Sequence, residues 1–142
     1  MGTGKSAVGR LLAKRLNRPF LDLDKSIEKE IGQTVPQIFE REGEAGFRRL
    51  EKQAVQRAAA LNGHVVATGG GVMMDEENIR TLKSSGVLVC LTANPDVILK
   101  RTEATLAFRP MLGGGNPRER IEELLRLRAP FYAQADVTMD TT

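Results

Sequence analysis

The sequence opens on a stretch whose residue types suit phosphate binding, Gly2-Thr3-Gly4-Lys5-Ser6. Glycines let backbone N–H groups close around phosphate oxygens, and the following helix adds a favourable dipole at its N-terminus. In such loops the lysine neutralises phosphate charge and the serine hydroxyl binds Mg²⁺. The first glycine of the usual pattern would precede Met1, so the alternative is an accidental glycine-rich terminus. The amphipathic segment that follows favours the phosphate loop.

Two carboxylates, Asp22 and Asp24, follow an apolar segment further along. In open parallel sheets ligands bind at the carboxyl ends of strands. Alternate carboxylates there would reach a metal-bound phosphate and an acceptor hydroxyl. The alternative is that Asp24 only caps the next helix.

Two charged side chains fall inside apolar helical stripes. Glu51 lies within a stripe that includes Phe47 and Ala54, with Arg48 at its edge. At a spacing of i, i+3 these two charges can pair and hold the guanidinium for a ligand carboxylate. Arg128 lies in a second stripe, where an arginine is costly unless it meets an anion. The alternatives are a surface salt bridge for the first pair and a structural ion pair for Arg128.

A run of three glycines and one arginine complete the candidate set. Gly69, Gly70 and Gly71 follow a buried strand, where backbone without Cβ atoms allows a ligand to approach closely. Arg109 precedes Pro110 in a segment with little periodicity, and a cation that closes over ATP would stabilise phosphoryl transfer. A tight turn and a solvated loop arginine are the alternatives.

The elements that must position these residues alternate between helices and apolar strands. A helical stripe over 7–16 contains Val8, Leu11, Leu12 and Leu16, and Thr34 with Gln37 resembles a capping box. The run at 87–92 is typical of a strand buried on both faces, and 103–116 is a candidate lid. Helices are predicted over 7–16, from 34, over 44–61, 75–84, 94–101 and 116–129, and strands over 20–24, 64–68, 87–92 and 135–140. The alternation predicts a single three-layer α/β domain over 1–142 with a mainly parallel sheet.

Composition narrows the classes of protein. The chain has 142 residues, 41% of them hydrophobic, and a net charge of +3 whose basic residues are interspersed with acidic ones. We therefore expect no nucleic-acid partner. No apolar run is long enough to cross a bilayer, so we expect no membrane partner and a cytoplasmic protein. We also expect a monomer. Cys90 and His64, the single cysteine and histidine, predict neither a disulfide nor a metal cluster.

Taken together, "GTGKS", "DLD", "FRRLE", "ATGGG", "FRPML" and "RAPFY", in this order, closely resemble the shikimate kinase family. The resemblance covers nearly the whole chain. It implies a P-loop fold related to nucleoside monophosphate kinases, with five parallel strands. It also implies transfer of the γ-phosphate of ATP to the 3-hydroxyl of shikimate, a step toward chorismate and the aromatic amino acids. A gluconate kinase and a non-catalytic nucleotide-binding fragment are the alternatives.

The resemblance also implies a role for each matching residue. Lys5, Asp24 and Arg109 would be catalytic, with Asp24 orienting or deprotonating the acceptor hydroxyl. ATP would be bound by Gly2, Thr3, Gly4, Lys5, Ser6, Ala7, Arg101 and Arg109. Shikimate would be bound by Asp24, Arg48, Glu51, Gly69, Gly70, Gly71 and Arg128. Mg²⁺ would be bound by Ser6 and, through water, by Asp22.

The chain departs from the family pattern at three places. Ala7 stands where the family usually has threonine, and the family has a strand and a glycine before this segment and a loop and helix after "DVTMDTT". The preceding strand would be central in the sheet, so its loss should expose unpaired ladder groups on both neighbours. We therefore expect these 142 residues to be poorly stable and weakly active.

Overall fold

The computed structural model describes residues 1–108, 110–112 and 114–142. Its α-helices are α1 (Lys5–Leu16), α2 (Leu23–Ile31), α3 (Val35–Ala59), α4 (Glu76–Ser85), α5 (Pro95–Thr102) and α6 (Pro117–Tyr132). The strands are β1 (Phe20–Asp22), β2 (Val65–Ala67), β3 (Val89–Thr92) and β4 (Val137–Asp140). Short 3-10 helices cover η1 (Val72–Met74), η2 (Glu103–Phe108) and η3 (Pro110–Leu112). None of the helices in this described part is long and apolar enough to cross a membrane.

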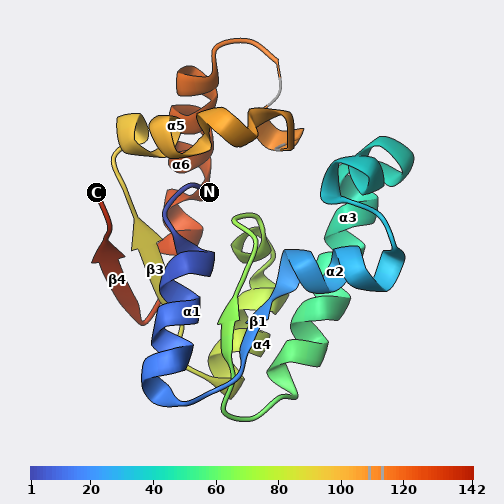
Figure 1. Ribbon diagram of the computed structural model, residues 1–142, viewed down its shortest axis with the longest axis vertical. Coiled ribbons are helices and arrows are strands. Elements are labelled where there is room, and N and C mark those ends of the chain that lie inside the picture. The colour runs from blue at the N-terminus through green and yellow to red at the C-terminus, as the bar shows by residue number, and fades with distance from the viewer. Residues whose placement is uncertain (109, 113) are drawn as a thin grey trace.

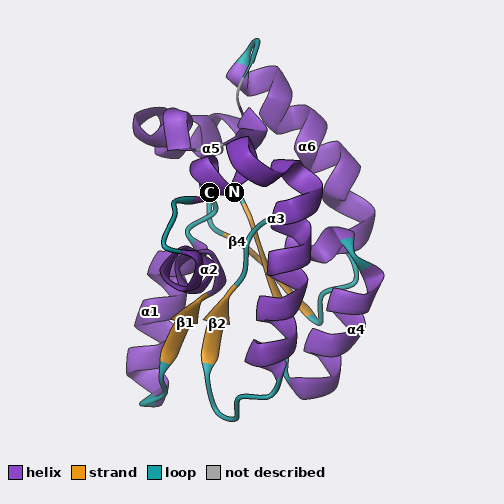
Figure 2. Ribbon diagram, turned by 90° about the vertical axis from the view of Figure 1, so that its right-hand side faces the viewer, coloured by secondary structure: helices purple, strands orange, loops and turns teal. Residues whose placement is uncertain are grey.

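The strands form two parallel pairs, β1 with β2 and β3 with β4. Helix α1 lies on one side of β1 and β2, and α3 and α4 lie on the other (Figure 2). The layering and the parallel strands confirm the predicted α/β class. Within the described residues no strand pairs with both β2 and β3, and α1 lies in front of the space between them (Figure 1). In the described part of the chain, β2 and β3 are therefore not joined into one sheet.

Local sequence patterns predicted where most of the helices begin. Thr34 and Gln37 make both hydrogen bonds of a capping box at the start of α3, as predicted. The predicted short and long helices are joined as one α3, with a kink where Gly43 has φ 69°. Asn94 caps α5 and Asn116 caps α6, each followed by proline in the first turn.

Two predictions of burial were wrong. The residues Val8, Leu11, Leu12 and Leu16 are 38–65% exposed, and α1 instead buries Gly9 and Ala13. A Cβ on Gly9 would lie 2.7 Å from the ring of Phe20, so α1 packs against β1 through its smallest residue. Val89 in β3 is 44% exposed, so this strand is not buried on both faces as the apolar run predicted.

Two apolar clusters hold the elements that carry the candidate site. One joins α2 to α3 through residues that include Ile27, Ile38 and Val55. The other joins α5 to η3 and α6 through residues that include Ile98 and Ile121. All five of these side chains are no more than 1% exposed. The charged residues of α3 and α6 are thereby fixed on rigid elements.

Candidate active site

The loop before α1 has a backbone that favours glycine at two positions. Gly2 and Gly4 have φ values of 63° and 88°, in the left-handed region that other residues rarely adopt. Gly4 is the N-cap of α1 and has no side chain with which to cap it. The first N–H groups of a helix have no acceptor within the helix, so those of α1 are left for a ligand of the loop. This arrangement suits an anion at a helix N-terminus.

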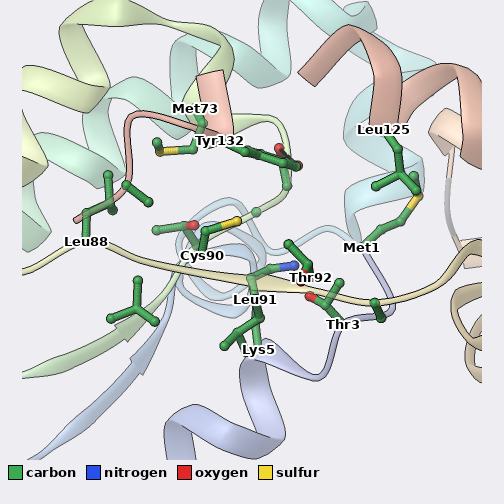
Figure 3. A pocket seen from close by; sticks show the side chains of 16 residues that line it. Met1, Thr3, Lys5, Met73, Leu88, Cys90, Leu91, Thr92, Leu125 and Tyr132 are labelled. Atoms are coloured by element: carbon green, nitrogen blue, oxygen red, sulfur yellow. Dashed lines mark hydrogen bonds between the residues drawn. The ribbon is translucent and has the colours of Figure 1, made fainter. Parts of the chain in front are cut away.

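The other predicted loop residues differ in exposure. Thr3 is 4% exposed, and its Oγ1 has no hydrogen-bond partner among the described residues. Lys5 is half-buried and, with Thr3, lines a small pocket of about 80 Å³ (Figure 3). Ala7 is exposed on α1.

Ser6 and Asp22 are brought together at the start of α1 and the end of β1. The Ser6 hydroxyl donates a hydrogen bond of 2.6 Å to Asp22 Oδ2. Two adjacent oxygen ligands beside a phosphate loop fit Mg²⁺, which binds oxygen and keeps several waters. Asp22 also caps α2 by accepting from the Lys25 N–H. The cap is thus Asp22, whereas Asp24, the residue considered for it, lies in the first turn.

Asp24 and Glu51 both lie against Gly69. A Cβ on Gly69 would lie 2.6 Å from Glu51 Oε1 and 3.0 Å from Asp24 Oδ1. Both oxygens are buried, and neither has a hydrogen-bond partner in the described part of the chain. Burial raises the pKa of both carboxyls, and the negative charge of Asp22 raises that of Asp24 further. Two acceptors without donors mark a place where a hydroxyl ligand fits.

Arg48 and Arg128 lie against the other two glycines of the run. A Cβ on Gly70 would lie 2.9 Å from Arg128 Nη1, and one on Gly71 would overlap the Arg48 guanidinium. None of the three glycines has a left-handed φ. The run therefore requires glycine for space, because each Cα is covered by a charged group of the candidate site.

The two arginines are held differently. Glu51, only 1% exposed, accepts a hydrogen bond from Arg48, as the i, i+3 spacing predicted. Arg128 is 6% exposed, and its positive charge lies close enough to Glu51 to oppose in part the rise that burial causes in the pKa of that carboxyl. Both guanidinium groups line a cavity of about 620 Å³ that Gly71 also borders. Arginines from α3 and α6 therefore converge on one cavity, where a carboxylate ligand would be held by both.

Of the two arginines predicted on the nucleotide side, only one can be placed. Arg101, in α5, donates to the Thr141 carbonyl at 2.7 Å. The Thr141 hydroxyl in turn donates to the Thr3 carbonyl at 2.9 Å, so Arg101 is connected to the phosphate loop through one residue. Arg109 lies outside the described residues.

Two polar residues of the site were not predicted from the sequence. Arg120 of α6 lines the large cavity and donates to the Met111 carbonyl at 3.0 Å. Tyr132 donates to the Gly70 carbonyl at 2.7 Å. Tyr132 lies four residues from Arg128 along α6 and Arg120 lies eight residues from it. This spacing of about one and about two turns indicated that both lie on the same side of the helix as Arg128.

Comparison with known proteins identifies the family. The shikimate kinase family profile matches residues 1–142. The chain belongs to the shikimate kinase family. It is 48% identical over 142 residues to shikimate kinase of Caldanaerobacter subterraneus subsp. tengcongensis, covering all of this chain and 82% of that one. The corresponding enzyme of Symbiobacterium thermophilum is 48% identical over 136 residues, covering 95% of this chain and 78% of its own.

Solved structures of shikimate kinases are similar to this chain in fold. That of Acinetobacter baumannii, in complex with shikimate, matches with a TM-score of 0.96 and 40% identity over all of this chain and 79% of its own. That of Aquifex aeolicus matches with a TM-score of 0.84 and 36% identity, covering 99% and 82%. This member of the shikimate kinase family is therefore an enzyme of the kinase class with the P-loop NTPase fold.

Proposed function

We propose that this chain transfers the γ-phosphoryl group of ATP to the 3-hydroxyl of shikimate, giving ADP and shikimate 3-phosphate. The observation that carries the proposal is the convergence of Arg48 and Arg128 on one cavity beside the buried carboxylates of Asp24 and Glu51. A ring that carries one carboxylate and several hydroxyls matches both halves of this arrangement. Gluconate also carries both groups, so the choice of acceptor must be tested directly.

The residues divide the work of phosphoryl transfer. Arg48 and Arg128 hold the shikimate carboxylate, and this anchor directs the ring hydroxyls toward Asp24. Asp24 accepts the proton of the 3-hydroxyl as its oxygen forms a bond to the γ-phosphorus. The bond from that phosphorus to the bridging oxygen breaks, and ADP leaves. Lys5 and the N–H groups at the start of α1 balance the charge on the phosphates.

Several finer assignments belong to the same proposal. Ser6 and Asp22 would hold Mg²⁺, which when bound neutralises phosphate charge. Arg101 would contact the nucleotide from α5, and Arg109 would close over ATP with the segment 103–116 as the lid. We further propose a cytoplasmic monomer with no nucleic-acid or membrane partner, organised as one domain over 1–142.

Phosphorus NMR of the reaction products tests the transfer. The protein is incubated with ATP and Mg²⁺ together with shikimate, gluconate or no acceptor. We expect a new phosphomonoester resonance only with shikimate, and none with the Lys5→Met variant, whose fold is checked by circular dichroism. Equal transfer to gluconate would contradict the acceptor assignment. Binding of ATP by calorimetry without any product would favour a non-catalytic nucleotide-binding protein.

A further inference from the structure

The phenol of Tyr132 joins α6 to the loop that follows β2. Tyr132 is one helical turn after Arg128, and its hydroxyl donates a 2.7 Å hydrogen bond to the carbonyl of Gly70. In Figure 3 it lies with Met73 on one side of the small pocket, and Cys90 of β3 points toward them. Burial raises the pKa of Tyr132, so the phenol remains a donor at neutral pH.

The hydrogen bond to Gly70 fixes the direction of the next N–H group. The peptide between Gly70 and Gly71 is trans and planar, so its N–H points away from its C=O. With the carbonyl turned toward Tyr132, the Gly71 N–H is turned away from the phenol. Gly71 borders the large cavity, which Tyr132 does not line. In the described part of the chain, no group accepts a hydrogen bond from this N–H.

The same phenol lies beside the Arg128 guanidinium. The position of a Cβ on Gly70 would be 2.9 Å from Arg128 Nη1 and 3.4 Å from Tyr132 Oη, so both groups cover one face of this glycine. The positive charge of Arg128 acts on the phenol and opposes the effect of burial on its pKa. Because the phenol gives its only proton to Gly70, its lone pairs remain for the guanidinium.

We propose that Tyr132 is a positioning residue for the anchoring of the acceptor's carboxylate. One hydroxyl orients the Gly71 N–H through the Gly70 carbonyl and braces the Arg128 guanidinium, and both donors serve the same anion. This inference rests on the proposed function, because it assigns these donors to the carboxylate of shikimate. Tyr132 itself need not touch the substrate.

The Tyr132→Phe variant removes only this hydroxyl. We expect its Kd for shikimate, measured by calorimetry, to rise about tenfold, while its Kd for ATP stays within twofold of the wild-type value. The KM for shikimate should rise similarly, with kcat changed by less than about threefold. Ser84→Ala is the matched control, since that hydroxyl donates to the Thr81 carbonyl at 2.8 Å on an exposed helix. It should change neither Kd.

Tyrosine fluorescence emission gives a second measurement, which should not respond to shikimate if the role of Tyr132 were purely structural. The chain has one tyrosine and no tryptophan, so its emission reports on Tyr132 alone. Shikimate should change this emission along the same saturation curve that calorimetry gives.

An unchanged Kd for shikimate in Tyr132→Phe, or equal losses for shikimate and ATP, would overturn the inference while leaving the proposed function intact. Emission that does not respond to shikimate would also count against it. A wild-type chain that binds no shikimate would instead overturn the proposed function, and the inference with it.

Discussion

The carboxyl of Asp24, whose Oδ1 is buried, has a pKa that burial raises. The raised pKa affects both the pH dependence of activity and the stability of the fold. A base must be deprotonated to accept the hydroxyl proton. Because the pKa of Asp24 is raised, kcat/KM should fall with decreasing pH at a value above the roughly 4 of an ordinary aspartate. Measuring kcat/KM for shikimate as a function of pH gives the pH at which this fall occurs.

The same raised pKa makes Asp24 unfavourable for stability at neutral pH. The folded state binds this proton more tightly than the unfolded state, so stability is lost as pH rises through the folded pKa. Asp24→Asn removes the charge and should raise the melting temperature by about 3 °C at pH 7, while kcat falls at least about a hundredfold. Differential scanning calorimetry and the kinase assay measure the two effects. A variant that melts lower, or retains its kcat, would contradict this account of Asp24.

Glu51 is expected to act through Arg48. Its carboxyl is only 1% exposed and pairs with the Arg48 guanidinium. Glu51→Ala leaves that guanidinium without its buried partner, which should cost about 3 kcal/mol in the free energy of unfolding. The KM for shikimate should rise about tenfold or more, because Arg48 loses its fixed position. Urea unfolding measures the free energy of unfolding, and Glu40→Ala, at an exposed position, is the control. An equal loss of unfolding free energy in both variants would be inconsistent with a buried pair.

At the scale of the elements, α1 meets β1 through its smallest residue. Gly9→Val would place atoms against the Phe20 ring, and such overpacking should cost about 2 kcal/mol. The KM for ATP should also rise, because Ser6 on α1 and Asp22 on β1 depend on the same contact. The exposed Leu11→Ala should stay within about 0.5 kcal/mol. If Leu11→Ala were the more damaging change in urea unfolding, the assigned packing face of α1 would be wrong.

This helix also shows why local patterns predicted some elements better than others. The capping box at Thr34 is confirmed because it depends on residues three positions apart. The face of α1 was wrong because Leu11 and Leu12 formed the stronger apolar stripe, whereas the contact with Phe20 depends on a small residue. Periodicity identifies an apolar face but does not reveal which elements cover it.

For the site, charges within apolar stripes were informative. Glu51 and Arg128 are both buried, as their places in the stripes of α3 and α6 predicted. Tyr132 was missed because a tyrosine on an apolar face is ordinary core material, and its partner is a backbone carbonyl 62 positions away. Sequence spacing within a helix does not reveal such a partner.

At the scale of the whole molecule, the two strand pairs are separate. β2 and β3 share no hydrogen bond, and the small pocket between the end of β2 and β3 is bordered by Leu91 and Cys90 (Figure 3). Among the residues that the structure describes, the facing edges of β2 and β3 have no ladder partners of the kind that a continuous sheet provides. We therefore expect the 142-residue chain to unfold at low temperature in a broad transition and to turn over slowly.

Differential scanning calorimetry with and without ligands measures the temperature and the breadth of this unfolding transition. Shikimate and ATP together should raise and sharpen the transition, because both bind only the folded state. Cooperative unfolding of the free chain together with ordinary turnover would show that the separated pairs cost little stability.

We propose above all that Arg48 and Arg128 form one site for the carboxylate of shikimate. Calorimetric comparison of shikimate with its uncharged methyl ester tests it most directly, because the two ligands differ at that group alone. The wild-type chain should bind the acid about a hundredfold more tightly than the ester. In Arg128→Ala this ratio should fall to about ten or less, since one of the two guanidinium groups is gone. Equal affinity of the wild-type chain for acid and ester would contradict the account.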